Sequence, residues 1–144
     1  MNAVSDSFKA ADGGRVIPRR MKLDKLVTLL VVDKIEDCLP AWEAVGYKVS
    51  VRVPETGPLG FAILTASSGE LMLQTRKSLA EDLPDVAARR PAYLLYADVP
   101  SVTEAKKAFR DAEVLVSRRK TFYGATEAWL ELPGKVILGL AEHA

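Results

Sequence analysis

Apolar and polar residues follow two periods along the chain, one of two residues and one of three to four. Runs of Leu and Val, or strict alternation of apolar and polar residues, are typical of strands, whereas apolar residues three and four positions apart are typical of a helix. In the first half of the chain these patterns predict a strand, a helix and three more strands, over residues 23–32, 33–45, 49–53, 60–66 and 70–75.

The second half repeats this order after a connecting segment that has helical character and ends before Pro91. We predict a strand, a helix, a strand and a final hairpin, over residues 92–96, 101–112, 114–116 and 122–142. Pro133 and Gly134 predict the tight turn of this hairpin, because Pro fixes its own φ and Gly accepts a positive φ.

Three capping boxes, in which a short polar residue is followed three positions later by Glu, predict helix starts at Asp33, Ser78 and Ser101. Pro40 lies inside the first predicted helix, and proline is tolerated only in a first helical turn. We therefore expect that helix to begin near Asp37.

The two halves match at a constant offset of 65 positions. Asp33 corresponds to Asp98 and Gly69 to Gly134, and the alternating valines of the two halves correspond in the same way. A constant offset over a strand, a helix and three strands indicates an internal duplication of one βαβββ unit. The predicted fold class is α+β, with two βαβββ modules.

The chain length and residue usage restrict the class of protein. A chain of 144 residues fits one domain, and its 20 basic and 19 acidic residues nearly cancel, so neither a nucleic acid nor a membrane partner is indicated. No stretch approaches the roughly 20 apolar residues that cross a bilayer. Cys38 is the single cysteine, which excludes an internal disulfide and favours a cytoplasmic location.

The first 21 residues differ from the rest of the chain. Residues 1–21 are polar and contain an Asp-Gly-Gly breaker, so we predict a flexible tail, and both its role and whether Met21 is the natural start stay open. The remainder, 22–144, is predicted to be one domain made of a first module, a connector and a second module, at 22–76, 77–90 and 91–144.

Four local features together resemble one known family. They are Asp33 after the first strand, the segments Trp42–Tyr47 and Gly69–Gln74, and the final hairpin from Tyr123 to Gly134. Residues 22–142 resemble the glyoxalase/bleomycin-resistance/extradiol-dioxygenase family, the vicinal oxygen chelate superfamily. The resemblance implies that each module curls into an open half-barrel, that the cavity holds a small ligand and that two copies form a homodimer.

The resemblance also implies where metal-dependent members carry His or Glu. These inward positions correspond here to Leu26, Leu73, Pro91 and Leu138, and none of the four side chains can bind a metal. A shift by one residue reaches only one weak ligand, the amide of Gln74. We therefore expect no metal and no other cofactor, and the resemblance predicts the fold without the metal-dependent reactions.

Aromatic and polar residues on the predicted strands are the remaining candidates for a site. Glu127 and Trp129 share one strand face, and Glu127 can shape the fold, contact a ligand or, if desolvated, act as a general acid or base. Because a slip of one residue exchanges strand faces, aromatic residues such as Tyr96 can lie in a pocket or in the core. The ligand-binding candidates are Phe61, Gln74, Tyr93, Tyr123, Glu127 and Trp129.

Three arginines, Arg76, Arg118 and Arg119, lie at the ends of predicted strands. We expect them to form a solvated rim, with contact to an anion as the alternative.

The first functional hypothesis is a metal-free binding protein that sequesters a small apolar or aromatic compound in a cavity of a homodimer. The alternative is a metal-independent isomerase or lyase that uses Glu127 to move a proton, in which Glu127→Gln abolishes turnover but retains binding. A third hypothesis is an interaction module without a small ligand. The pattern leaves open the ligand, any turnover and the dimer arrangement.

Overall fold

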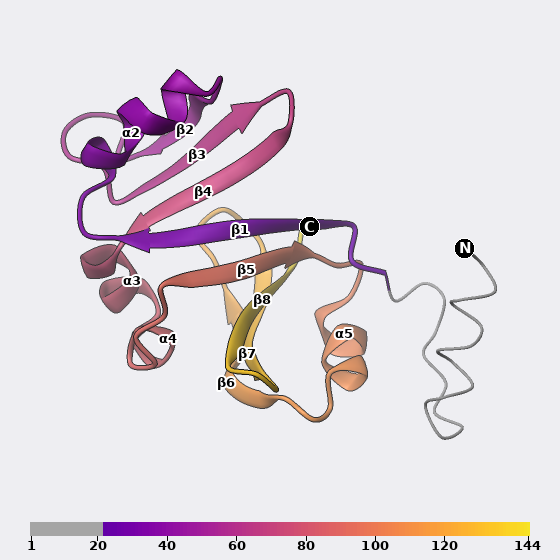
Figure 1. Ribbon diagram of the computed structural model, residues 1–144. Helices are drawn as coiled ribbons and strands as arrows, with labels where there is room; N and C mark the ends of the chain where they lie inside the picture. Colours follow the sequence, from indigo (N-terminus) through magenta and orange to yellow (C-terminus); the bar gives the residue numbers. More distant parts are fainter. Residues whose placement is uncertain (1–21) are drawn as a thin grey trace.

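The computed structural model describes residues 22–144, which form eight strands and four helices (Figure 1). The predicted tail, 1–21, lies outside the described residues. The first half contains β1 (Lys25–Val32), α2 (Ile35–Ala44), β2 (Lys48–Val53), β3 (Phe61–Ala66) and β4 (Gly69–Thr75). Two short helices connect the halves, α3 (Arg76–Asp82) and α4 (Pro84–Ala87). The second half contains β5 (Tyr93–Asp98), α5 (Val102–Ala108), β6 (Glu113–Lys120), β7 (Thr126–Leu132) and β8 (Val136–Glu142).

All eight strands of the described chain belong to one mixed sheet with the order β2-β3-β4-β1-β5-β8-β7-β6. The two halves meet in the middle of the sheet, where β1 and β5 pair antiparallel, and the pairs β1–β4 and β5–β8 are parallel. Equivalent strands keep the predicted offset: β2 and β6 begin at Lys48 and Glu113, and β3 and β7 begin at Phe61 and Thr126, 65 positions apart in each case. The predicted α+β fold of two βαβββ units is confirmed.

The start of the first helix differs from its prediction. Helix α2 begins at Ile35, two residues before Asp37, and no side chain caps it. The side chain of Glu36, which the capping box assigned to Asp33, instead accepts a hydrogen bond from the backbone N–H of Leu59 at 2.8 Å. The predicted cap is wrong because a tertiary contact uses this carboxylate.

The other predicted helix starts and the turn have mixed outcomes. The hydroxyl of Thr75 caps α3 by accepting from the N–H of Ser78 at 3.0 Å, so the prediction that Ser78 itself is the cap is wrong. Ser101 caps α5 as predicted, since its Oγ accepts from the N–H of Glu104 at 3.2 Å. The predicted Pro-Gly turn joins β7 to β8, and Lys135 N–H closes it on the carbonyl of the last β7 residue at 3.1 Å.

Two faces of the sheet are covered by different helices. On one, which we call the helix face, α2 and α5 each cover a buried cluster that includes Leu73 and Leu138, respectively. On the other, which we call the connector face, the residues of α3 and α4 pack against the central strands. The buried cluster of the connector face consists of Leu29, Val31, Leu79, Leu83, Val86, Leu94, Trp129 and Ile137.

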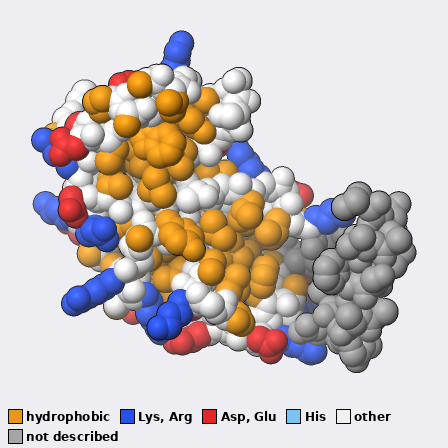
Figure 2. Space-filling view, viewed as in Figure 1, with side chains coloured by type: hydrophobic (Ala, Val, Ile, Leu, Met, Phe, Trp, Pro, Cys, Tyr) orange, Lys and Arg blue, Asp and Glu red, His pale blue; other side chains and the backbone are white. Residues whose placement is uncertain are grey.

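Part of the connector face stays open in the first half of the chain. Val51 and Val53 on β2 are 42 and 40 % exposed. On β3, Ile63 is the cross-strand partner of Val51, and Phe61 is the partner of Val53. Ile63 is also the cross-strand partner of Met72 on β4. Directly opposed residues of antiparallel strands point to the same side, so these residues form one apolar strip. Figure 2 shows hydrophobic side chains gathered over the middle of the side in view, with charged side chains around them.

Within residues 22–144, no helix is both long enough and apolar enough to cross a membrane.

Candidate functional site

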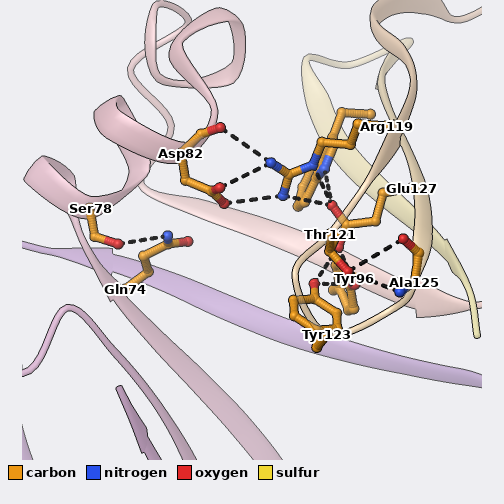
Figure 3. Close-up of polar contacts among 10 residues, drawn as sticks. Gln74, Ser78, Asp82, Tyr96, Arg119, Thr121, Tyr123, Ala125 and Glu127 are labelled. Atoms are coloured by element: carbon orange, nitrogen blue, oxygen red, sulfur yellow. Dashed lines mark hydrogen bonds and ion pairs between the residues drawn. The ribbon is translucent and has the colours of Figure 1, made fainter. Parts of the chain in front are cut away.

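Glu127 lies at the centre of a buried polar cluster on β7. Its carboxylate is 1 % exposed and accepts hydrogen bonds at both oxygens (Figure 3). Oε1 accepts from Arg119 Nε at 2.9 Å and from Trp129 Nε1 at 3.0 Å. Oε2 accepts from the hydroxyl of Tyr123 at 2.5 Å and from that of Tyr96. We call these five residues the Glu127 cluster.

Strand register brings four members of this cluster together. Glu127 and Trp129 share a face of β7 because they are two residues apart, and Arg119 on β6 is the cross-strand partner of Glu127. Gly139 on β8 lies between Trp129 and Tyr96, since it is in register with both. A Cβ atom at Gly139 would lie 2.6 Å from the indole, so the missing side chain makes room for the ring. The rings of Tyr96 and Trp129 lie 5.8 Å apart.

The loop before β7 supplies the fifth member. The N–H of Ala125 donates to Thr121 Oγ1 at 2.9 Å, and the N–H of Thr121 donates to the Ala125 carbonyl at 2.9 Å. Gly124 closes this loop with a φ of +87°, a conformation that glycine adopts without steric cost. Tyr123 lies in this loop. It is half-exposed, and its hydroxyl points inward at Glu127 (Figure 3).

Arg119 connects the cluster to the connector helix α3. Its Nη1 and Nη2 donate to the two carboxylate oxygens of Asp82 at 3.0 and 3.1 Å (Figure 3). Burial disfavours the charged guanidinium, but hydrogen bonds to Asp82 and the charge of Glu127 outweigh burial and raise the pKa of Arg119. Arg119 therefore stays charged and compensates Glu127.

The two phenols of the cluster are held in their neutral form. Burial, followed by the hydrogen bond to Glu127, raises the pKa of Tyr123 to about 12. Burial and the negative charge of Glu127 also raise the pKa of Tyr96. The two hydroxyl oxygens lie 3.1 Å apart. Because a phenol that donates its proton keeps lone pairs, the pair can accept hydrogen bonds from a ligand.

This geometry favours a structural role for Glu127 over proton transfer. Four side chains donate to its carboxylate, and a salt bridge of 2.8 Å to Arg119 Nη2 adds a further contact at Oε1. A general base needs an oxygen within reach of a substrate proton. The buried carboxylate holds the pair of phenol oxygens in place, 3.1 Å apart.

The structure separates the predicted ligand-binding residues into three groups. Tyr123, Glu127 and Trp129 meet in the Glu127 cluster. Phe61 and Gln74 are cross-strand partners in the first half of the chain. Gln74 is 7 % exposed, and its Nε2 donates to a hydroxyl of the connector at 3.1 Å, so one N–H of its amide is occupied.

Tyr93 does not lie with the other candidates. It is in register with Leu30, which packs against the α2 cluster on the helix face, whereas the next residue, Leu94, belongs to the connector-face cluster. Tyr93 is 46 % exposed on the helix face, opposite the Glu127 cluster.

Sequence reasoning missed the roles of Tyr96 and Arg119. Tyr96 carries no pattern that separates a pocket residue from a core residue, and Arg119 was expected on a solvated rim. The signal for Arg119 is its place across an antiparallel pair from Glu127. The irregularities between Val114 and Val116 and between Val116 and Arg119 lie beyond Arg119 as counted from the loop that joins β6 to β7, so the pair of Arg119 and Glu127 keeps the register set beside that loop.

Two of the positions inferred for metal ligands lie on the helix face. Leu73 and Leu138 point to the helix face, where they are buried under α2 and α5. The neighbouring residues Gln74 and Gly139 alternate with them and point to the connector face. They offer only one amide, so these positions do not fit a transition metal. In the described part of the chain, no group of three or more His, Cys, Asp and Glu side chains could hold a metal ion.

The two βαβββ halves, joined edge to edge through β1 and β5, have the fold of the glyoxalase/bleomycin-resistance superfamily, in agreement with the resemblance seen in the sequence. No protein-family model matches the sequence, and no curated protein is similar to it. The likeness is found among solved structures.

Three solved structures illustrate this likeness. A glyoxalase/bleomycin resistance protein/dioxygenase superfamily member from Vibrio splendidus 12B01 is 15 % identical, with a TM-score of 0.59 over 84 % of this chain and 99 % of that one. Methylmalonyl-CoA epimerase from Mycobacterium tuberculosis is 13 % identical, with a TM-score of 0.61 over 92 and 95 %. A protein from Staphylococcus aureus is 15 % identical, with a TM-score of 0.60 over 86 and 100 %. At these identities the likeness shows the fold alone.

Proposed function

We propose that the protein binds a small, largely apolar or aromatic molecule on the connector face and holds it without chemical conversion. The observation that carries the proposal is the pair of phenol oxygens of Tyr96 and Tyr123, which lie 3.1 Å apart and are positioned by a buried carboxylate. Such a pair recognises a ligand that donates a hydrogen bond, such as a phenol or an N–H group.

Apolar residues elsewhere on the connector face support the same proposal. Phe61, Met72 and Tyr96 are partly exposed and pack against the same connector-face cluster. Small-molecule sites combine an apolar lining with a few fixed polar groups that orient the ligand. Burial of apolar ligand surface contributes about 25 cal/mol per Å², which supplies the affinity, while the phenol pair supplies the specificity.

Two naphthalenes that differ in one hydrogen-bond donor test this proposal. 2-Naphthol can donate to the phenol pair, whereas 2-methoxynaphthalene has a similar ring surface and cannot. We expect calorimetry to show tighter binding of 2-naphthol. Tyr123→Phe should weaken it roughly 2- to 10-fold, because one neutral hydrogen bond contributes about 0.5–1.5 kcal/mol, and should leave 2-methoxynaphthalene unchanged.

The matched control is Tyr93→Phe, which removes a phenol hydroxyl from a tyrosine on the helix face, away from the proposed site. It should leave the binding of both naphthalenes unchanged. Equal affinity of the two compounds for the unmodified protein, or equal effects of the two substitutions, would contradict the proposed site.

We also propose that the protein acts in the cytoplasm as a homodimer. The single cysteine supports the reducing compartment. Partly exposed apolar residues such as Leu26, at 53 %, and Val51, at 42 %, support association of two copies, which would remove them from water. Sedimentation equilibrium at micromolar concentration tests the dimer, and a mass of one chain would contradict it.

A further inference from the structure

We propose that a pocket between β1 and the connector binds a small amphipathic carboxylic acid, with Arg90 and Arg76 contacting its carboxylate. The pocket has a volume of about 430 Å³ and is lined by Val31, Arg76, Leu79, Ala80, Ala87, Arg90 and Pro91. It includes no residue of the Glu127 cluster, so the inference is independent of the function proposed above.

The lining of the pocket has two parts of different chemistry. Five side chains are apolar, and two of them, Val31 and Leu79, belong to the buried connector-face cluster, so one wall of the pocket is continuous with the core. The other two lining residues are arginines. Volumes of 300–1,000 Å³ are usual for sites of small organic molecules.

Arg76 has hydrogen-bonding capacity left for a ligand. Its Nε donates to Asp33 Oδ1 at 3.0 Å, and Nη1 makes a long contact of 3.5 Å with the carbonyl of Pro91. The ion pair is solvent-exposed, since Asp33 is 90 % exposed, and such pairs contribute little. A guanidinium has five N–H donors, so Arg76 can keep Asp33 and still donate to a second carboxylate.

Arg90 is the stronger indication of a bound anion. Among residues 22–144 it makes no ion pair, although it lines the pocket and is exposed. Its backbone has a φ of +52°, in the left-handed region that glycine occupies at less cost. The chain therefore carries a charged side chain beside an apolar cavity at a position where the backbone favours glycine.

The ligand class follows from these two parts. A carboxylate accepts paired hydrogen bonds from a planar guanidinium, and an apolar body fills the space against Val31 and Leu79. A neutral amphiphile would leave Arg90 without a charged partner, and a cationic one would be repelled. Inorganic anions would leave the apolar lining unused.

Nuclear magnetic resonance titrations with four probes test the inference: octanoate, 1-octanol, octylamine and inorganic phosphate. With the full-length, uniformly ¹⁵N-labelled protein, octanoate should shift the amide signals of Leu79, Ala80 and Ala87 and bind about tenfold more tightly than 1-octanol. Octylamine and phosphate should give no saturable shift at these amides. Equal binding of octanoate and 1-octanol, or binding of phosphate as tightly as octanoate, would overturn the inference.

Arg90→Gly is a sharp variant because glycine accepts the positive φ, so the charge is removed without strain in the backbone. Octanoate affinity should fall about tenfold while the melting temperature is unchanged or higher, and Arg90→Lys should retain an intermediate affinity.

Two control variants lie outside the pocket. Arg110→Ala, at an exposed arginine, should have no effect on octanoate affinity. Tyr123→Phe should also leave octanoate binding unchanged. Unaltered octanoate affinity in Arg90→Gly would contradict the assignment.

Discussion

At the scale of single residues, the Glu127 cluster shows how a buried charge is accommodated. The carboxylate is 1 % exposed, and an isolated charge at such a site would be very costly. Arg119 supplies the opposite charge, and the hydroxyls of Tyr96 and Tyr123 and the indole of Trp129 supply donors. The result is a rigid polar group in which both phenol hydroxyls lie against the buried carboxylate.

The raised pKa of Tyr123 gives a prediction at the residue scale. Because the folded state holds this proton more tightly than the unfolded chain, where a tyrosine has a pKa of about 10, the stabilisation is complete below about pH 10. It is lost as the pH rises towards about 12. We expect an ultraviolet titration of the native protein to show a phenol ionising near pH 12, and Tyr123→Phe to remove it.

Circular dichroism on the same samples controls for alkaline unfolding. An identical titration curve for the unmodified protein and Tyr123→Phe would contradict the proposed environment of this phenol.

At the scale of elements, pairing of β7 with β8 fixes the indole on which the cluster depends. Trp129 is 2 % exposed and lies over its cross-strand partner Gly139. Three ring atoms lie 2.6, 2.7 and 2.8 Å from the place that a Cβ of residue 139 would occupy. Glycine is therefore required here for close packing, although it weakens strands elsewhere.

Gly139→Ala should destabilise the protein by about 1–3 kcal/mol, because a buried ring has little room to move. Chemical denaturation measures this loss. In a Trp129→Leu background the same substitution should cost much less, since the clashing ring is absent, and the two changes should be strongly non-additive. Equal costs in the two backgrounds would contradict the packing described.

Elements were predicted from the sequence more reliably than the side chains that surround the site. The order of strands and helices follows from periodicity, and the offset between the halves survives in the structure. The helix start near Asp37 failed because α2 begins at Ile35 and accommodates Pro40 in its interior. The cap at Asp33 failed because Glu36 is used by the N–H of Leu59, a contact distant in sequence. Arg119 was missed because the strand was predicted over residues 114–116, whereas β6 extends from Glu113 to Lys120 and pairs Arg119 with Glu127.

Counting errors of one residue had the largest effect on the predicted site. A shift of one position exchanges the two faces of a strand, and Leu73 and Leu138, which the resemblance placed at inward positions, are buried on the helix face. Tyr93 was predicted together with the other ligand-binding candidates but lies on the helix face. Strand periodicity alone does not say which face of the sheet the connector covers.

At the scale of the whole molecule, the connector divides one face of the sheet into a closed and an open part. Helices α3 and α4 cover the central strands, and Arg119 ties α3 to the second half through Asp82. The strip that includes Val51, Val53 and Phe61 stays partly exposed. The strip therefore lies in the first half of the chain and the phenol pair in the second, with the central strands between them.

The measurement that tests this account most directly is a titration with 2-naphthol of protein whose four tyrosine rings are ¹³C-labelled. We predict that the ring signals of Tyr96 and Tyr123 shift in proportion to occupancy and show contacts to the naphthol protons. The signals of Tyr47 and Tyr93 should stay in place. Shifts confined to Tyr47 or Tyr93, or saturable binding without a shift of Tyr96 and Tyr123, would place the ligand elsewhere and contradict the proposed site.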